Sequence, residues 1–165
     1  MVKSLLVLFL FLLASHVGAN EIAGRVVGVA DGDTITVLDA SNELYKIRLS
    51  GIDAPEKKQP FGTASKQSLS NLIFNRAVII HWQKRDSYGR IVGKVMLDDV
   101  DMNLEQIKAG MAWFYRQYQK QQPIQDQADY ALAEQEAKAN KLGLWVDEAP
   151  IEPWNFRRSK SNTRP

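Results

Sequence analysis

The sequence contains no cysteine, only two histidines and a single long apolar run among its 165 residues. Without cysteine the chain has no disulfide framework, no thiolate zinc site, no cysteine nucleophile and no lipid-modified cysteine. With 45% hydrophobic and 24% charged residues, the composition is that of an ordinary globular protein of one domain. Any catalytic chemistry must therefore come from side chains other than cysteine.

The apolar run lies at the N-terminus, where Lys3 precedes Leu5 to Ala14 and the small residues Val17-Gly18-Ala19 follow. A basic start, a short apolar stretch and a small-residue cleavage site are typical of a secretory signal peptide. The run is shorter than the ~20 apolar residues that span a bilayer. We therefore predict a signal peptide over residues 1–19 and an exported protein, periplasmic or secreted, that leaves the membrane after cleavage. An uncleaved N-terminal anchor is the alternative.

Charge is distributed unevenly along the chain. Residues 20–155 hold 16 basic and 19 acidic residues, whereas the last ten residues hold four basic ones: Arg157, Arg158, Lys160 and Arg164. Any affinity for nucleic acid must therefore come from local clusters or from this basic end, not from the body as a whole. We predict a folded domain over residues 20–147 and a basic, flexible tail over residues 148–165.

Three strands, one helix, two strands and two helices are predicted after residue 20. The strands are expected at 21–29, 34–38, 44–49, 77–82 and 90–97, because apolar and polar residues alternate there or β-formers gather between turn residues. Helices are expected at 63–75, 101–109 and 123–142. The last helix is predicted to face inward with the stripe Ile124, Ala128, Ala131, Leu132 and Ala139. This α+β order matches the OB-fold, a five-stranded Greek-key β-barrel, here with three α-helices.

Carboxylates gather on two tight turns, Asp31-Gly32-Asp33-Thr34 and Gly51-Ile52-Asp53-Ala54-Pro55-Glu56. Oxygen ligands of this kind suit a hard cation such as calcium, and the absence of histidine and cysteine beside them disfavours zinc. Arg48 lies within one predicted strand and Arg90 opens another, and a guanidinium matches phosphate oxygens bidentately. Taken singly, each turn is more often only a turn, and each arginine is more often a solvated strand residue paired with an acid.

The order of these pieces is specific. Asp31-Gly32-Asp33-Thr34, Ile47-Arg48-Leu49, Asp53-Ala54-Pro55-Glu56, Asp86-Ser87-Tyr88-Gly89-Arg90 and Leu142-Gly143-Leu144-Trp145 follow one another as they do in staphylococcal nuclease and its thermonuclease relatives. The chain resembles that family over residues 22–145, nearly its whole length after the predicted signal. Ala54 stands where the best-known member has threonine.

Together with the predicted signal peptide, the resemblance implies an exported, calcium-dependent endonuclease with an OB barrel, which cleaves DNA and RNA and leaves 3′-phosphates. It implies that the side chains of Asp33 and Asp53 and the backbone carbonyl of Ala54 bind Ca²⁺. Glu56 would be the general base, and Arg48 and Arg90 would hold the scissile phosphate. Tyr88 and Tyr118 would contact the bound nucleotide. A monomer with no stable protein partner is expected.

A non-catalytic OB-fold module that binds single-stranded nucleic acid is the rival hypothesis. Such a binder needs basic and aromatic residues but has no use for a metal-binding carboxylate set. The chain retains the two aspartates, the glutamate and both arginines, which favours the enzyme. Trp113, Phe114 and Tyr115 could stack on bases, although large aromatics of this kind more often belong to the core.

Overall fold

The computed structural model describes residues 20–162. The predicted signal peptide lies outside these residues. Within them, no helix is long and apolar enough to cross a membrane.

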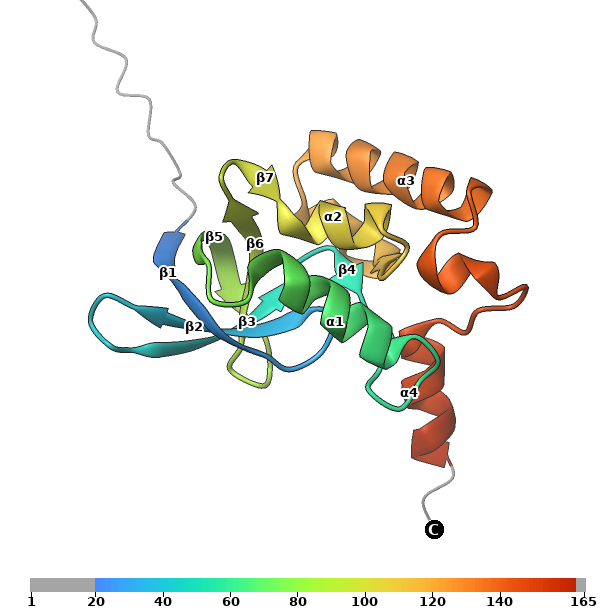
Figure 1. The fold of residues 1–165 in the computed structure, drawn as a ribbon, viewed down its shortest axis with the longest axis horizontal. Coiled ribbons are helices and arrows are strands. Elements are labelled where there is room, and N and C mark those ends of the chain that lie inside the picture. The colour runs from blue at the N-terminus through green and yellow to red at the C-terminus, as the bar shows by residue number, and fades with distance from the viewer. Residues whose placement is uncertain (1–19, 163–165) are drawn as a thin grey trace, which may run out of the picture.

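Five strands of the described chain close into a barrel (Figure 1). They are β1 (Asn20–Val29), β2 (Thr34–Asp39), β3 (Leu44–Leu49), β5 (Ala77–Arg85) and β6 (Ile91–Leu97). Antiparallel pairing runs in the order β3-β2-β1-β5-β6, and parallel pairing of β3 with β6 closes the ring. This connectivity confirms the predicted α+β fold class with an OB-type barrel.

Alternate side chains of the strands fill the barrel. Ile35 and Val37 of β2 and Ile47 and Leu49 of β3 are buried. Successive side chains of a strand point to opposite faces of the sheet, so these residues share the inner face. Arg48, between two buried neighbours on β3, consequently lies on the outer face of the barrel.

Three short strands complete the sheets. The segment β7 (Val100–Asp101) pairs with the end of β6. The segments β4 (Ile52–Asp53) and β8 (Trp113–Phe114) form a separate antiparallel pair beside the barrel. The pairing of β4 with β8 fixes the position of Asp53 relative to the barrel.

Helices α1 (Gly62–Ile73), α2 (Met102–Lys108) and α3 (Ile124–Ala139) lie on one side of the barrel (Figure 1). They confirm the three predicted helices, with ends that differ by a few residues. The side chain of Asp101 accepts hydrogen bonds from the backbone N–H groups of Asn103 and Leu104, and so caps the start of α2. Two 3₁₀ segments, η1 (Arg116–Gln121) and η2 (Gly143–Val146), flank α3.

The predicted inward stripe of α3 is wrong. The buried residues of α3 are Tyr130, Ala133, Glu134 and Ala137, whereas Ile124 and Leu132 of the predicted stripe are 85% and 55% exposed. Polar contacts set the buried face of this helix. The hydroxyl of Tyr130 donates to Asp101, and the carboxylate of Glu134 accepts from the N–H of Phe114. A buried carboxylate needs such partners, so the helix turns Glu134 toward the N–H of Phe114. Ile124 and Leu132 are then left on the exposed side of α3.

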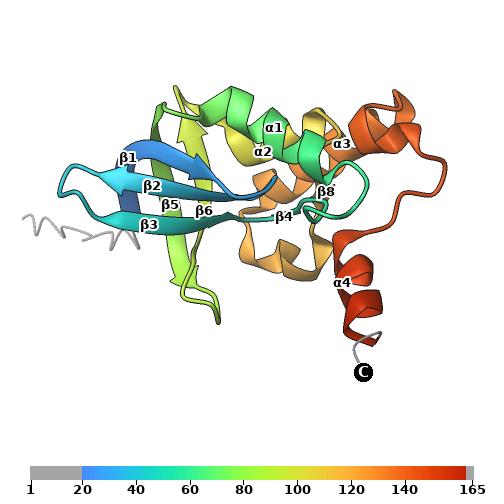
Figure 2. The same cartoon turned by 60° about the horizontal axis from the view of Figure 1, so that its bottom comes forward.

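The segment predicted as a flexible tail contains a helix, α4 (Pro153–Asn162). Pro153 opens it, and proline suits the first turn of a helix because it has no N–H to leave unpaired. The ring of Trp154 stacks on Tyr115, with 5.3 Å between ring centroids and 8° between planes. Figure 2 shows α4 at the end of the molecule where β4 and β8 lie.

Candidate active site

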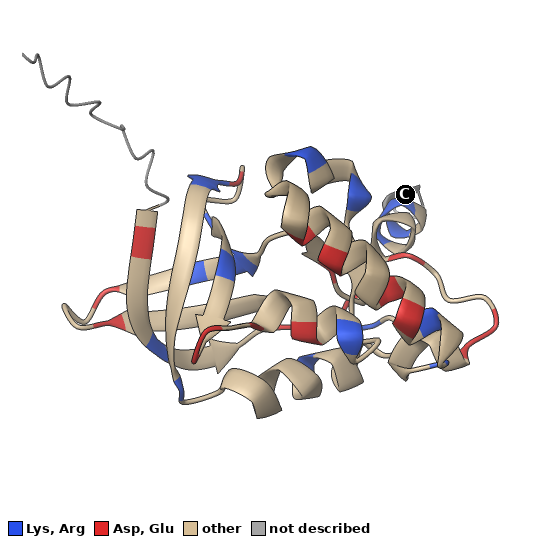
Figure 3. Ribbon diagram, turned by 90° about the horizontal axis from the view of Figure 1, so that it is seen from above, with Lys and Arg blue, Asp and Glu red and all other residues tan. Residues whose placement is uncertain are grey.

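One groove of about 1380 Å³ collects every predicted site residue. Its lining includes Asp33, Arg48, Asp53, Ala54, Glu56, Tyr88, Arg90 and Tyr118. Pockets for small molecules typically enclose roughly 300–1,000 Å³, so this groove has room for a segment of a polymer. In the view of Figure 3, basic and acidic residues of the described chain are interspersed along the ribbon and do not form one basic face.

The turn that connects β1 to β2 is fixed from two sides. The N–H of Asp33 donates to the carboxylate of Asp31 at 3.1 Å, a local bond typical of aspartate turns. The buried amide of Gln106, on α2, donates to the carbonyl of Gly32 at 2.9 Å. A side chain at Gly32 would lie 1.8 Å from Oγ of Ser65, so only glycine lets α1 approach this turn. The carboxylate of Asp33 is thereby held in place.

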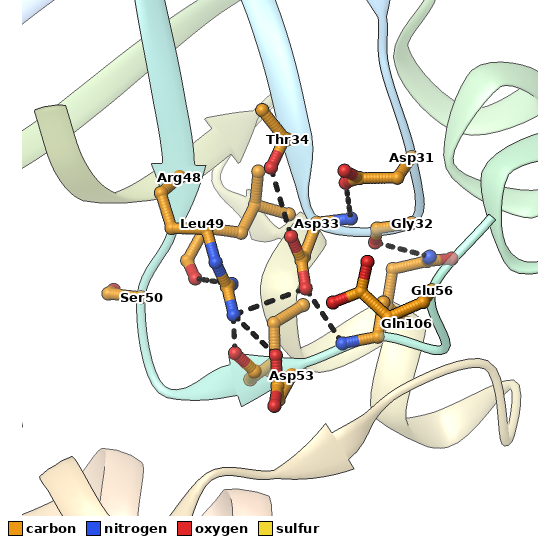
Figure 4. Close-up of polar contacts among 12 residues, drawn as sticks. Asp31, Gly32, Asp33, Thr34, Arg48, Leu49, Ser50, Asp53, Glu56 and Gln106 are labelled. Atoms are coloured by element: carbon orange, nitrogen blue, oxygen red, sulfur yellow. Dashed lines mark hydrogen bonds and ion pairs between the residues drawn. The ribbon is translucent and has the colours of Figure 1, made fainter. Parts of the chain in front are cut away.

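Asp33 joins the first turn to the second (Figure 4). Its Oδ1 accepts a hydrogen bond from the hydroxyl of Thr34 at 3.0 Å, and its Oδ2 accepts from the N–H of Ala54 at 2.7 Å. Nη2 of Arg48 lies 3.2 Å from the same Oδ2. Asp33 is 6% exposed, so these partners replace the water that a free carboxylate would bind.

The second turn places Asp53. Gly51 has a φ of 72°, which favours glycine, and its carbonyl accepts from the N–H of Tyr115. The side chain of Asn103, fully buried on α2, donates to the carbonyl of Ser50 at 2.9 Å. These bonds fix the turn that carries Asp53. Its side chain, only 1% exposed, lies in the groove lining together with Asp33.

Arg48 is not a solvated strand residue. Its Nη1 donates to the carbonyls of Leu49 and Ile52 at 2.8 and 2.9 Å, and its Nη2 donates to Asp53 at 2.8 Å. The side chain is 13% exposed. The guanidinium is thus pre-positioned at the groove wall by contacts on three sides.

Arg90 precedes β6 and is held by the loop that leads into that strand. Its Nε donates to Asp86 at 2.7 Å, and its Nη1 lies 3.4 Å from Oγ1 of Thr34. Burial raises the pKa of Asp86, but hydrogen bonds from Arg90 and from the N–H of Tyr88 outweigh it and bring this pKa below its ordinary value. Asp86 is therefore a firmly ionised partner that orients Arg90.

Two carboxyl groups of the groove have raised pKa values. Burial, together with the charge of Asp33, raises the pKa of Asp31 to about 6. Burial also raises the pKa of Asp53, although hydrogen bonds from Arg157 and the charge of Arg48 oppose this. Carboxyl groups in such surroundings are stabilised by any cation that approaches them.

The donor set fits a hard cation. Oxygen atoms of Asp33, Asp53 and Glu56 face the groove, and the guanidinium of Arg157 already lies between the last two as a positively charged stand-in. Within residues 20–162, no three acidic or histidine side chains converge as a ready-made metal site. The physical reason is visible in the contacts: these carboxylates are directed at Arg48, at Arg157 and at the N–H of Ala54.

Sequence reasoning missed Arg157, which it assigned to a flexible tail. Nη2 of this residue lies 2.8 Å from Asp53, and Nη1 lies 2.8 Å from Glu56. A signal was available, since Trp154 and Phe156 are large aromatics in a segment assigned to solvent, and Pro153 is a helix-start residue.

The aromatic residues divide into core and groove. Trp113 and Phe114 are 8% and 2% exposed, which confirms the core interpretation for these two. Tyr115 lines the groove together with Tyr118, and their rings meet edge to face at 5.0 Å. Tyr88 is 84% exposed at the rim. The three tyrosines therefore present ring surface to any molecule in the groove.

The chain is similar in sequence to several known proteins. Residues 46–147 match the family model described as staphylococcal nuclease homologue. An uncharacterized endonuclease of Haemophilus influenzae is 41% identical over 160 residues, covering 97% of this chain and 85% of that protein. An uncharacterized endonuclease of Escherichia coli is 40% identical over 154 residues, covering 93% and 96%. A micrococcal nuclease of Shigella flexneri is 37% identical over 151 residues, covering 86% and 84%. The chain therefore belongs to the staphylococcal nuclease family and is a nuclease of that family.

Proposed function

We propose that this nuclease is an exported, calcium-dependent endonuclease that hydrolyses phosphodiester bonds of DNA and RNA and leaves 3′-phosphate ends. The observation that carries the proposal is the convergence of two arginines and three carboxylates on one polymer-sized groove. Arg48 pairs with Asp33 and Asp53, and Arg90 reaches Thr34, which itself donates to Asp33. Phosphodiester hydrolysis needs this combination, because negative charge grows on the phosphate while a water molecule must be deprotonated.

The two arginines face the groove because of strand register. Arg48 of β3 lies opposite Val92 of β6 in the parallel pair. Arg90 precedes Val92 by two residues, and residues two apart share a face of a sheet. Both guanidinium groups therefore approach a bound phosphate from the same outer face, where planar N–H forks match its oxygens.

Asp33 and Asp53 would hold the calcium ion through their side chains, with the backbone carbonyl of Ala54 as a further ligand. Their oxygen-only chemistry suits Ca²⁺. A calcium ion bound there would polarise a phosphoryl oxygen and neutralise developing charge.

Glu56 is the candidate general base. Its side chain is 39% exposed, so water from the groove reaches its carboxylate, whereas that of Asp53 is almost fully enclosed. A carboxylate that is open to water and lines the same groove as Arg48 and Arg90 is a candidate to accept a proton from the attacking water.

The groove also offers contacts for the rest of the polymer. Lys46, Lys84 and Lys94 line it together with the tyrosines, and base–aromatic stacking tolerates any sequence in DNA or RNA. The rival hypothesis, a non-catalytic binder of single strands, explains the lysines and tyrosines but gives no use to the carboxylates.

Export is supported by the sequence of the N-terminus. Lys3, the short apolar run from Leu5 to Ala14 and the small residues Val17-Gly18-Ala19 form the pattern of a cleaved secretory signal peptide.

The decisive experiment is cleavage of circular plasmid DNA and of RNA by the purified mature protein. We expect cleavage with calcium, loss of cleavage with a calcium chelator, and recovery when calcium is restored. The products should resist polymerase extension until a phosphatase removes their 3′-phosphates. Undiminished cleavage in excess chelator would refute the metal assignment. Retention of single strands without cleavage would establish the rival binder.

Mass spectrometry of the exported protein should give a first residue at Asn20, and an intact Met1 would establish the anchor.

A further inference from the structure

Helix α4 carries Arg157 into the groove, where its guanidinium pairs with two carboxylates of the candidate active site. Nη2 lies 2.8 Å from Oδ2 of Asp53, and Nη1 lies 3.2 Å from Oδ1 of the same residue. Nη1 also lies 2.8 Å from Oε1 of Glu56. Arg157 thus binds one proposed metal ligand with both arms of its fork and binds the proposed base with one of them.

The helix is anchored at its first turn. Trp154 stacks on Tyr115, and its ring centroid lies 5.9 Å from that of Trp113 in an edge-on contact. Pro153 is buried, and the side chain of Gln59 donates to the carbonyl of Ile151 just ahead of it. Residues three apart on a helix lie on the same face, so anchoring Trp154 directs Arg157 toward the groove.

Arg157 occupies the carboxylate oxygens of Asp53 and Glu56 that a bound cation would need as ligands. Oδ1 of Asp53 already accepts from Arg48 at 2.8 Å and from Arg157, and a carboxylate oxygen has about two lone-pair sites. A calcium ion on the same carboxylate would also stand directly beside the positive guanidinium. Like charges this close repel strongly where the surroundings are poor in water.

The side chain of Arg157 is nevertheless easy to displace. It is 43% exposed, whereas that of Arg48, the other partner of Asp53, is 13% exposed and is held by two backbone carbonyls. Asp53 is buried and needs a positive partner, but the guanidinium end of the pair is open to water, so Arg157 can return to solvent when another cation takes its place at the carboxylate. Of the two arginines, Arg157 is therefore the one that a cation can expel.

We propose that Arg157 is a tethered cation that occupies the calcium site of the free enzyme and must leave before the metal binds. The proposal rests on the calcium dependence proposed above. While Arg157 is bound, Asp53 is unavailable as a calcium ligand. Glu56 is engaged in an ion pair at the same time, so it is not free to accept a proton from water. Calcium binding displaces the guanidinium and loosens the part of α4 that follows Trp154.

Calcium titration by isothermal calorimetry, without nucleic acid, tests the competition directly. We expect Arg157→Gln to bind calcium about tenfold or more tightly than wild type, because the variant no longer spends most of its time in a state that cannot bind. Arg157→Lys, which keeps the charge but loses the fork, should lie between the two. Arg158→Gln is the matched control: it removes the same charge at the next position, and neither Asp53 nor Glu56 pairs with Arg158. It should bind like wild type.

Limited proteolysis of the wild-type protein gives a second, independent readout. We expect calcium to accelerate trypsin cleavage after Arg157 and Arg158, detected by mass spectrometry, relative to cleavage at exposed Lys141 in the same sample. In Arg157→Gln, cleavage after Arg158 should be fast with or without calcium. An unchanged melting temperature of the variant would show that its fold is intact.

The outcomes separate this proposal from the proposed function. Equal calcium affinity of wild type and Arg157→Gln, or weaker binding by the variant, would overturn the displacement model while leaving calcium dependence in place. Unchanged cleavage of the helix by trypsin on calcium addition would overturn it as well. If neither protein binds calcium, the metal assignment itself fails.

Discussion

Arg48 donates a hydrogen bond of 2.8 Å to the carboxylate of Asp53, and so connects a proposed phosphate-binding side chain to a proposed metal ligand across the turn between β3 and β4. The same guanidinium satisfies the carbonyls of Leu49 and Ile52. One side chain therefore serves both the shape of the turn and the chemistry of the groove. The two proposed arginines should differ for this reason when they are mutated.

Replacing Arg48 by lysine should reduce both turnover and stability. Loss of the fork removes transition-state stabilisation worth roughly 3 kcal/mol or more, which is over a hundredfold in rate. The buried carbonyls and the carboxylate left without donors should lower the free energy of unfolding by about 1–3 kcal/mol. Turnover and chemical denaturation of the same preparation measure the two effects. Arg76→Lys, at an exposed position outside the groove, makes the same exchange as a control and should change neither.

Replacing Arg90 by lysine should reduce turnover alone. Arg90 donates to Asp86 at the groove and makes no bond to a buried carbonyl, so we expect at least about a hundredfold loss of turnover with a nearly unchanged melting temperature. Arg85→Lys is a matched control, since Arg85 donates to Gly89 in the same loop and lies outside the proposed chemistry. Normal cleavage by Arg90→Lys would remove this residue from the mechanism.

Replacing Glu56 by glutamine should leave the fold intact and slow the reaction. Glutamine keeps the size of the side chain but cannot accept a proton from water, and general-base contributions are typically on the order of 10²–10⁴-fold. Single-turnover rates of plasmid cleavage at saturating calcium provide the measurement. A variant within a few-fold of wild type would show that another group takes the proton.

Asp86→Asn should reveal a pH-dependent contribution to stability. The pKa of Asp86 is lowered in the folded protein, so its ionised form stabilises the fold above the unfolded-state value of about 3.9. This contribution is lost as the pH falls through the folded-state pKa. We expect the variant to be less stable than wild type at pH 7 and the difference to shrink below pH 4. Urea unfolding at several pH values tests this, and a gap that stays constant down to pH 3 would contradict it.

Much of the barrel could be predicted because its signal is local. In β3, Ile47 and Leu49 are buried and Lys46 is exposed, as the alternation in the sequence indicates. The eight predicted site residues share one groove, since strand ends and turns of a closed barrel converge wherever their motifs lie in the chain. Their individual roles remain predictions, as do the boundary after residue 147 and the monomeric state.

The features that sequence analysis missed depend on contacts distant in the chain. The strands β4 and β8 have two residues each, too few to show a period. The buried face of α3 is set by Glu134, a charged residue whose burial is possible only because Phe114, Arg116 and Lys138 supply its partners. The docking of α4 depends on the ring of Tyr115, about forty positions before Trp154.

The parallel pairing of β3 with β6 has a kinetic consequence. Arg48 lies on one of these strands and Arg90 directly precedes the other, 42 positions later, so the two approach each other only when this pair, which closes the barrel, has formed. Contacts that are distant in the chain are slow to form, because a long loop must first be ordered. Nuclease activity should therefore return late in refolding, after the hairpins that circular dichroism detects. The time between the two signals would measure how long the ring stays open.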